Sequence, residues 1–321
     1  PKSPISTVLI AILLGILMGN AFTPRPGMMI GLDFTQQYIL KLGIIFLGIR
    51  LSFADFIKFG SIAIPLIIIC IVGVLILVKL LIKKVPISSK MSYLIAIGTS
   101  VCGATAIVAT APVINAKKSE VAYAIANITL FGVIAMLLYP YFAEWYFDNE
   151  ALNIGLFLGT SIHETSQVAA AGLIYDQQFN SPETLNVATV TKLIRNTFLV
   201  VLIPLFAFLY NRGELKGQKY SIFNIFPYFV LGFIGMIIVR NLGDQFYPVG
   251  SNNHEIWVNL IEYFKILTTV FLTMAMAAVG ISINLSELKS MGYKPFVVGL
   301  IAAVTVGIIS LIYIETLNKF I

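Results

Sequence analysis

Long apolar runs separated by short polar connections dominate the pattern of hydrophobic and polar positions along this 321-residue chain. A helix needs about 20 mostly apolar residues to cross the hydrocarbon core of a bilayer. The pattern therefore predicts an all-α polytopic membrane protein: ten hydrophobic segments, one transmembrane domain over residues 1–321 and no soluble domain. The segments lie near residues 5–20, 36–50, 60–82, 91–115, 118–142, 152–175, 186–210, 222–240, 257–283 and 294–318.

The segment at 152–175 loses its apolar character in the middle. Seven polar or ionisable side chains stand between the apolar flanks 154–158 and 168–173. A lipid-facing charge or irregular backbone finds no water at that depth, so such a run must face protein or a water-filled cavity. The rest of the chain can be interpreted as the scaffold that provides this cavity.

An internal repeat relates this broken segment to an earlier one. Residues 97–105 resemble 158–166 at an offset of 61, and residues 138–143 resemble 202–207 at an offset of 64. Each unit is therefore a broken segment followed by a full helix.

A second repeat matches residues 47–56 with residues 279–288 at an offset of 232, so the second copy is rearranged rather than duplicated head to tail. Internal repeats with broken helices at matching positions are typical of secondary transporters. Chance similarity among small apolar residues is the alternative for either match alone.

Loop charges predict that the two broken segments enter the membrane from opposite sides, because cytoplasmic loops are enriched in Lys and Arg. Lysines flank the segment at 91–115, whereas acidic residues flank the segment at 152–175. We therefore expect each segment to enter and leave on its own side, with inverted repeat units; full crossing with parallel units is the alternative. The flanking residues are Lys83, Lys84, Lys90, Lys117 and Lys118 on the cytoplasmic side, and Glu144, Asp148, Glu150, Asp176 and Glu183 on the external side.

A broken helix exposes free N–H groups that suit anions at one half-helix, and free C=O groups that suit cations or water at the other. Two breaks meeting near the midplane would form a small pocket of neutral donors. The alternative is that the Ser and Thr side chains bond back to their own helices. The candidate binding residues are Thr99, Ser100, Cys102 and Thr105 in the first break, and Thr160, Ser161, Thr165, Ser166 and Gln167 in the second.

Only the second break carries an ionisable pair, His163 and Glu164, at the positions that Cys102 and Gly103 occupy in the first. Histidine changes charge near physiological pH, and a desolvated carboxyl group can also hold a proton there. The pair therefore predicts proton coupling. A permanent counter-ion role for Glu164 is the alternative.

Two cations, Lys192 and Arg195, share one face of the following helix because they are three residues apart. Charges inside a span need neutralisation by protein or by substrate. If Glu164 pairs with one, the other is free for an anion, and Arg suits a forked contact with an oxyanion. Both could instead reach the membrane interface. Further candidates at comparable depth are Asn196, Asn127 and Thr129.

Composition and missing motifs exclude other classes. The chain is 58% hydrophobic and 11% charged, so its net charge of +6 in short loops indicates no nucleic acid partner. The two cysteines lack metal-ligand spacing, and neither a nucleotide-binding loop nor a nucleophile–base set occurs. We expect no enzyme activity, no metal site and no cofactor apart from a coupling Na⁺ or H⁺. Because the chain starts at Pro1, we expect its natural N-terminus to lie upstream.

Four motifs in this order, at 46–52, 100–106, 159–165 and 192–196, resemble the YeiH family, whose members are labelled candidate sulfate exporters. More distantly, a small-residue break followed by a helix is similar to the bile acid:sodium symporter and cation:proton antiporter group. That resemblance implies a core domain with two broken helices, which moves as an elevator beside a panel domain. The segment order here departs from that group's simple five-plus-five repeat.

These observations predict a multi-pass protein of the cell membrane, a secondary active transporter that exports a small anion, sulfate or sulfonate-like. The alternative is a cation:proton antiporter with Glu164 as the ion carrier. The expected partners are a small inorganic or organic anion and the lipid bilayer. A homodimer is a further possibility.

Overall fold

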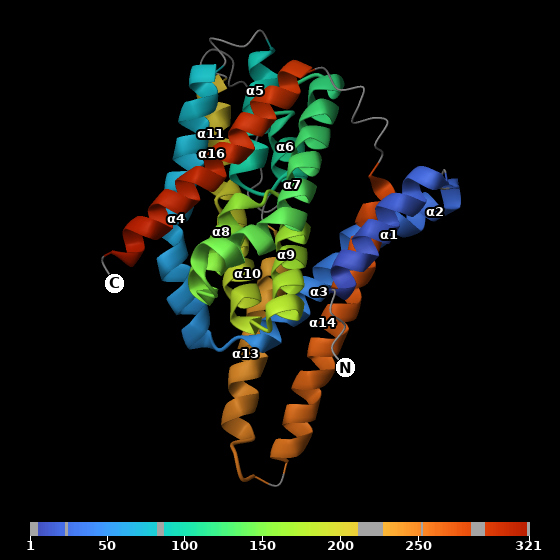
Figure 1. The fold of residues 1–321 in the computed structure, drawn as a ribbon, viewed down its shortest axis with the longest axis vertical. Coiled ribbons are helices and arrows are strands. Elements are labelled where there is room, and N and C mark those ends of the chain that lie inside the picture. The colour runs from blue at the N-terminus through green and yellow to red at the C-terminus, as the bar shows by residue number, and fades with distance from the viewer. Residues whose placement is uncertain are drawn as a thin grey trace.

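The computed structural model describes residues 6–22, 25–81, 87–210, 227–251, 253–283 and 293–319. All regular secondary structure within these ranges is helical, which confirms the predicted all-α membrane fold (Figure 1). Seven helical stretches are long and apolar enough to span a membrane. The helices are α1 Thr7–Ala21, α2 Pro26–Phe34, η1 Thr35–Ile39, α3 Leu40–Leu47, η2 Gly48–Arg50, α4 Phe53–Leu81, α5 Ser89–Ser100, α6 Ala104–Thr110, α7 Lys118–Phe147, α8 Ala151–Ser161, α9 Thr165–Phe179, α10 Pro182–Thr197, α11 Leu199–Tyr210, α13 Phe229–Phe246, α14 His254–Ser282 and α16 Tyr293–Asn318.

Two groups of helices make up the molecule. The panel helices are α1, α2, η1, α3, η2, α13 and α14; the core helices are α4 to α11 and α16. In the panel, α1 lies so close to α14 that a Cβ on Gly15 or Gly280 would run into the backbone of the other helix. In the core, α10 packs against α8, α9 and α4, while α16 packs against α4, α5, α7 and α8.

The first broken segment folds back as a hairpin of α5 and α6. Lys90, near the start of α5, donates to the carbonyl of Asn115, beyond α6, at 2.7 Å. Ser88 also bonds Glu120 in the first turn of α7. The two ends of this segment therefore lie at the same end of the bundle.

The second broken segment folds back in the same way, as a hairpin of α8 and α9. Thr184, near the start of α10, bonds the carbonyl of Ala151 at the start of α8 at 3.3 Å. Tyr175 of α9 bonds Glu144 near the end of α7. Because the 30 residues of α7 separate the open ends of the hairpins, the hairpins enter the core from opposite ends (Figure 1).

The breaks fall at the same places in the two matched segments. Helix α5 ends at Ser100 and α8 at Ser161, while α6 begins at Ala104 and α9 at Thr165. The returning helix α11 brings Phe206 within 5.9 Å of the Tyr93 ring near the start of α5, measured between ring centroids. Thus α10 and α11 run opposite to α7, the inverted arrangement that the loop charges favour. In the second repeat, residues 284–288 lie outside the described ranges.

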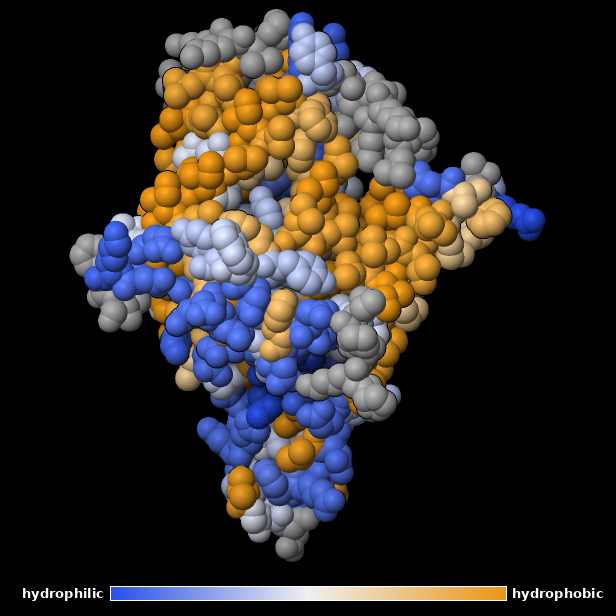
Figure 2. Space-filling model, in the orientation of Figure 1, coloured by the Kyte–Doolittle hydropathy of each residue, from blue (hydrophilic) through white to orange (hydrophobic). Residues whose placement is uncertain are grey.

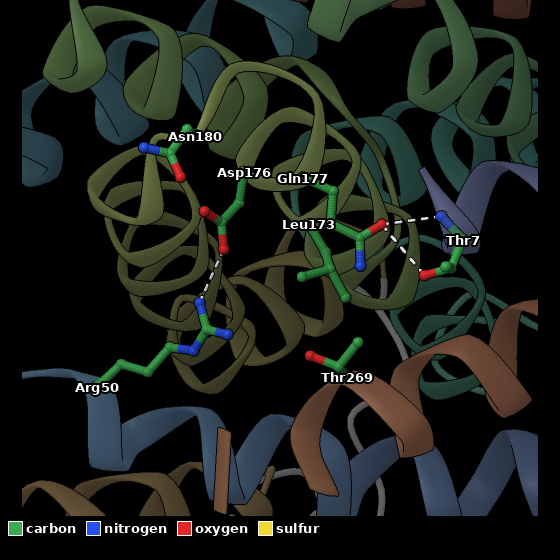
Figure 3. A pocket seen from close by; sticks show the side chains of 7 residues that line it. All are labelled: Thr7, Arg50, Leu173, Asp176, Gln177, Asn180 and Thr269. Carbon is green, nitrogen blue, oxygen red and sulfur yellow. Dashed lines mark hydrogen bonds and ion pairs between the residues drawn. The ribbon is translucent and has the colours of Figure 1, made fainter. Parts of the chain in front are cut away.

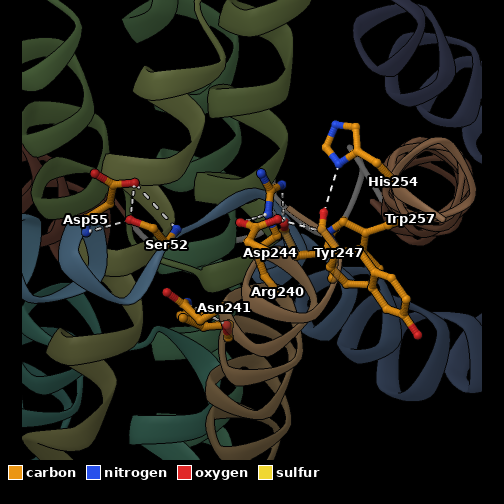
Figure 4. Close-up of polar contacts among 10 residues, drawn as sticks. Ser52, Asp55, Arg240, Asn241, Asp244, Tyr247, His254 and Trp257 are labelled. Carbon is orange, nitrogen blue, oxygen red and sulfur yellow. Dashed lines mark hydrogen bonds and ion pairs between the residues drawn. The ribbon is translucent and has the colours of Figure 1, made fainter. Parts of the chain in front are cut away.

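Apolar side chains cover much of the outer surface (Figure 2). Hydrophilic residues gather toward the end where α13 and α14 join, which projects beyond the helices of the core (Figures 1 and 2). At that junction Asp244 accepts from Trp257 at 2.8 Å and from Arg240 at 2.7 Å, and the ring of His254 contacts the carbonyl of Tyr247 at 2.8 Å (Figure 4). The contacts of Trp257 and His254 tie α13 to the start of α14, where Trp257 also packs against Ile49 and Ile261.

Candidate functional site

The tips of the two hairpins meet inside the core, and Lys192 of α10 joins them. Its ammonium group donates to the carbonyls of Val101 at 2.8 Å, Ile162 at 3.0 Å and His163. Lysine has three donors, so these three oxygens use them all. The oxygens belong to the breaks at the C-terminal ends of α5 and α8, where the helix dipole favours a cation.

Arg195, one turn further along α10, makes a second cross-link of the same kind. Its Nε donates to the carbonyl of Ser100 at 2.6 Å, and its two terminal nitrogens donate to the carbonyls of Thr99 and Thr160. Arg195 is fully buried. Backbone oxygens of both hairpins therefore solvate this cation in place of water.

This geometry changes the expected roles of the two cations. Among the described residues, neither Lys192 nor Arg195 forms an ion pair with Glu164, and neither reaches the membrane interface. The forked face of Arg195 binds carbonyls, so it is not available to an oxyanion. The sequence reasoning missed this because the free C=O groups come from two different hairpins, which only the tertiary structure brings together.

Glu164 sits at the N-terminus of α9. Its carboxylate and the amide of Gln167 form a capping box, in which the Glu164 N–H donates to Gln167 Oε1 at 3.2 Å. The hydroxyl of Thr129 in α7 lies 3.5 Å from the carboxylate. On the facing tip, Gly103 has φ +69°, and a Cβ there would run into the Glu164 side chain. The carboxylate therefore already occupies the anion-favouring end of this half-helix.

A cavity of about 260 Å³ lies where the hairpin tips face the panel helices. Five of the predicted site residues line it: Cys102, Thr105, Glu164, Thr165 and Ser166. The opposite helices contribute polar residues that the sequence reasoning missed, namely Gln36, Gln37 and Lys41. One signal was available: Lys41 is a charged residue inside the predicted apolar segment 36–50.

Other predicted site residues support the tips from behind the cavity. The hydroxyls of Ser100 and Thr160 bond back to the carbonyls of Ala96 at 2.6 Å and Leu156 at 2.7 Å, as the alternative interpretation of these residues expected. Thr160 also contacts Ser310 of α16 at 2.7 Å. Thr99, Ser161 and His163 are buried among the tips, and Ser161 Oγ and His163 Nδ1 have no partner within the described residues.

The two asparagines lie in different places. Asn196 donates to Thr165 Oγ1 at 2.9 Å and so supports the cavity wall. Asn127 instead donates to the carbonyl of Pro295 at 2.8 Å and packs against Gly299 of α16, away from the cavity. Residues two apart point to nearly opposite sides of a helix. Thr129, two residues after Asn127 in α7, therefore faces Glu164 and the cavity side instead.

A second contact between core and panel lies at the open end of the α8–α9 hairpin. Arg50 of η2 pairs with Asp176 of α9 at 2.9 Å, and Gln177 accepts from Thr7 of α1 at 3.0 Å (Figure 3). Asp55 caps α4 with Ser52, the two side chains being 2.6 Å apart (Figure 4). Asp55 thus caps its own helix, whereas Arg50 binds the core.

A family model described as Conserved hypothetical protein 698 matches residues 2–299. The chain belongs to this family. A UPF0324 membrane protein of Fusobacterium nucleatum is 34% identical over 314 residues, which cover 96% of this chain and 89% of the relative. A UPF0324 membrane protein of Streptococcus agalactiae serotype V is 35% identical over 303 residues, 93% and 86% of the two chains.

The UPF0324 inner membrane protein YeiH of Escherichia coli strain K12 is 32% identical over 305 residues, covering 92% of this chain and 81% of the relative. The expected membership of the YeiH family is therefore confirmed, as is the multi-pass membrane location. No solved structure matches the chain at a significant level.

Proposed function

We propose that the protein is a secondary active transporter of the cell membrane that exports a small anion, sulfate or a sulfonate, by an elevator-type motion. The observation that carries this proposal is the cavity between the broken hairpins and the panel helices. Broken helices that meet inside a membrane protein are the usual site of substrate and coupling ions in such transporters. Lys192 and Arg195 hold both hairpins to α10, so the core helices form a natural moving unit.

Glu164 gives the site a coupling group. It lines the cavity at a break in the membrane-embedded core, where a fixed negative charge repels an incoming anion. A proton or Na⁺ on this carboxylate would remove the repulsion, so that the anion and its coupling cation bind together. His163, buried beside the cavity, is the second candidate for proton transfer.

The test is transport of labelled sulfate in proteoliposomes. We expect wild-type protein to exchange internal for external sulfate and to respond to an imposed pH or Na⁺ gradient. Glu164→Gln should keep the exchange and lose the response to the gradient. Glu262→Gln is the matched control, because Glu262 is an exposed carboxylate that pairs with Lys265 on α14. Failure of wild-type protein to move sulfate or any sulfonate would reject the anion proposal.

A cation:proton antiporter is the second candidate, favoured by the presence of a carboxylate in the cavity lining. In that case Na⁺ or K⁺ flux would depend on pH, would ignore oxyanions and would disappear entirely in Glu164→Gln. The two candidates thus differ both in substrate and in the behaviour of one variant.

A further inference from the structure

Lys41 is a charged residue in the middle of an apolar helical stretch. It lies within the span Pro26–Arg50. It is exposed, and it forms no hydrogen bond or ion pair with any described residue. An ionised side chain at that depth is costly unless it faces a cavity or a partner. Lys41 lines the cavity at the hairpin tips, so the cavity is where its charge is accommodated.

The local backbone is built to present this lysine. Residues Thr35–Ile39 form a π-helical turn directly before α3. Such a turn inserts one residue and rotates the following side chains by about 100° relative to a regular helix, and it often marks a functional position. Gln36 anchors the turn to α14 by bonding the Ala278 carbonyl at 3.2 Å and Ser282 Oγ at 2.7 Å. The position of Lys41 is therefore held by the panel and does not depend on the hairpins.

The two cations of α10 near the tips bind backbone oxygens and do not line the cavity. Lys192 spends its three donors on carbonyl oxygens, and Arg195 is enclosed by the carbonyls of both hairpins. Among the residues that line the cavity, the ionisable groups are Lys41, Glu164 and Cys102. Within the part of the chain that the structure describes, an anion that enters the cavity therefore meets one positive charge, and that charge comes from the panel.

We infer that Lys41 is the residue that selects a small oxyanion in this cavity, acting across the boundary between panel and core. This inference rests on the proposed transport function and assigns the residue that binds its anion. The lysine ammonium is a compact charge with three donors, which suits a tetrahedral or sulfonate oxyanion. Gln37, Thr105 and Ser166 line the same space and add neutral donors. Glu164 faces that space as well, so the oxyanion binds together with a cation on the carboxylate, and each ligand strengthens the other.

The experiment is isothermal titration of sulfate into purified protein in detergent, with Na⁺ present at a fixed concentration and pH. A charge-assisted contact contributes about 1.5–3 kcal/mol, so Lys41→Gln should weaken sulfate binding about tenfold to a hundredfold. Lys41→Arg keeps the charge and should bind sulfate nearly as well as wild type. Lys58→Gln is the matched control, because Lys58 lies on α4 beside the Phe59 ring and does not line the cavity.

Sulfate binding by Lys41→Gln at wild-type strength would overturn the assignment of Lys41 and leave the transport proposal intact. Absence of oxyanion binding in wild-type protein would instead reject the proposed function itself. Size-exclusion elution and thermal unfolding without ligand establish that each variant is folded. If Lys41→Gln is not, the comparison uses Lys41→Met, whose stem fills the same space; equal binding by that folded variant also overturns the inference.

An independent measurement places the ligand beside the lysine. In a background without Cys70 and Cys102, Leu40→Cys in the apolar part of the cavity lining should react with a thiol reagent, and sulfate should slow this reaction. The protection should vanish when Lys41→Gln is added. Protection that persists would show that sulfate binds without the lysine and would also overturn the inference.

Discussion

The two hairpin tips have the same arrangement of half-helices and the same cross-links to α10, but they differ in the side chains at the break. Three residues separate the half-helices in each, 101–103 and 162–164, and the same two cations of α10 hold the carbonyls of both. Gly103 of the first tip occupies the matched position of Glu164 in the second, and a Cβ at Gly103 would run into that side chain. Two inverted elements that meet cannot both place a side chain at the meeting point. The two tips can therefore approach each other closely because one has a glycine where the other has a glutamate.

The largest effect is expected from the residue that both tips use. Arg195→Met removes the donors of three buried backbone carbonyls, and each unsatisfied group costs about 1–3 kcal/mol, so the free energy of unfolding should fall by about 3 kcal/mol or more. Thermal unfolding in detergent measures the loss. Arg240→Met, at a half-exposed arginine on α13, should change it much less. Hydrogen exchange should increase in both tips; an increase confined to one tip would contradict the shared cross-link.

A smaller loss of stability should follow from adding a side chain at Gly103, where the first tip makes room for Glu164. Gly103→Ala combines an unfavourable positive φ with a collision against Glu164, and we expect a loss of about 2 kcal/mol. Gly27→Ala on α2, where a Cβ meets nothing within 4 Å, is the control and should be close to neutral. Adding Glu164→Ala to Gly103→Ala should recover part of the loss. Strictly additive effects would show that the two positions do not touch.

The side chain of Glu164 in the second tip should contribute less to stability than the cross-links that hold the two tips together. Glu164→Ala removes the cap of α9, which costs about 1 kcal/mol. Cys102→Ser at the first tip should cost less, because the serine hydroxyl can still accept from the Ala106 N–H of α6 that the sulfur contacts. Unfolding of the two single variants under one condition gives the comparison. A larger loss for Cys102→Ser would reverse the assigned roles.

The smallest effect concerns the open end of the second hairpin, which an ion pair ties to the panel. Asp176→Asn should cost about 1 kcal/mol or less, and the loss should shrink at high salt. Glu262→Gln, in the more exposed pair with Lys265, should cost less still. An equal loss at low and high salt would mean that packing rather than charge explains the contact.

The sequence was most informative where hydrophobic length and broken periodicity carry the signal. The apolar segments, the positions of both breaks and the family were predictable, because a bilayer imposes a fixed length on helices and excludes polar runs from lipid. The partners of Lys192 and Arg195 were not predictable, since their acceptors are backbone oxygens that carry no side-chain signature. Lys41 was visible in segment 36–50, but only the fold places it in the cavity beside Glu164.

The cross-links made by α10 restrict the ways in which this molecule can move. To part the hairpin tips, the chain would have to pull buried backbone oxygens away from Lys192 and Arg195, which costs free energy for every buried group left without a partner. Two spectroscopic labels at exposed positions 108 and 180, one on each hairpin, should therefore keep a constant separation while sulfate is transported. Their separation from a label at exposed position 30 of the panel should change. If the core moves against the panel as proposed, the boundary between them runs through the cavity, and an ion bound there would exchange part of its coordination shell with each movement.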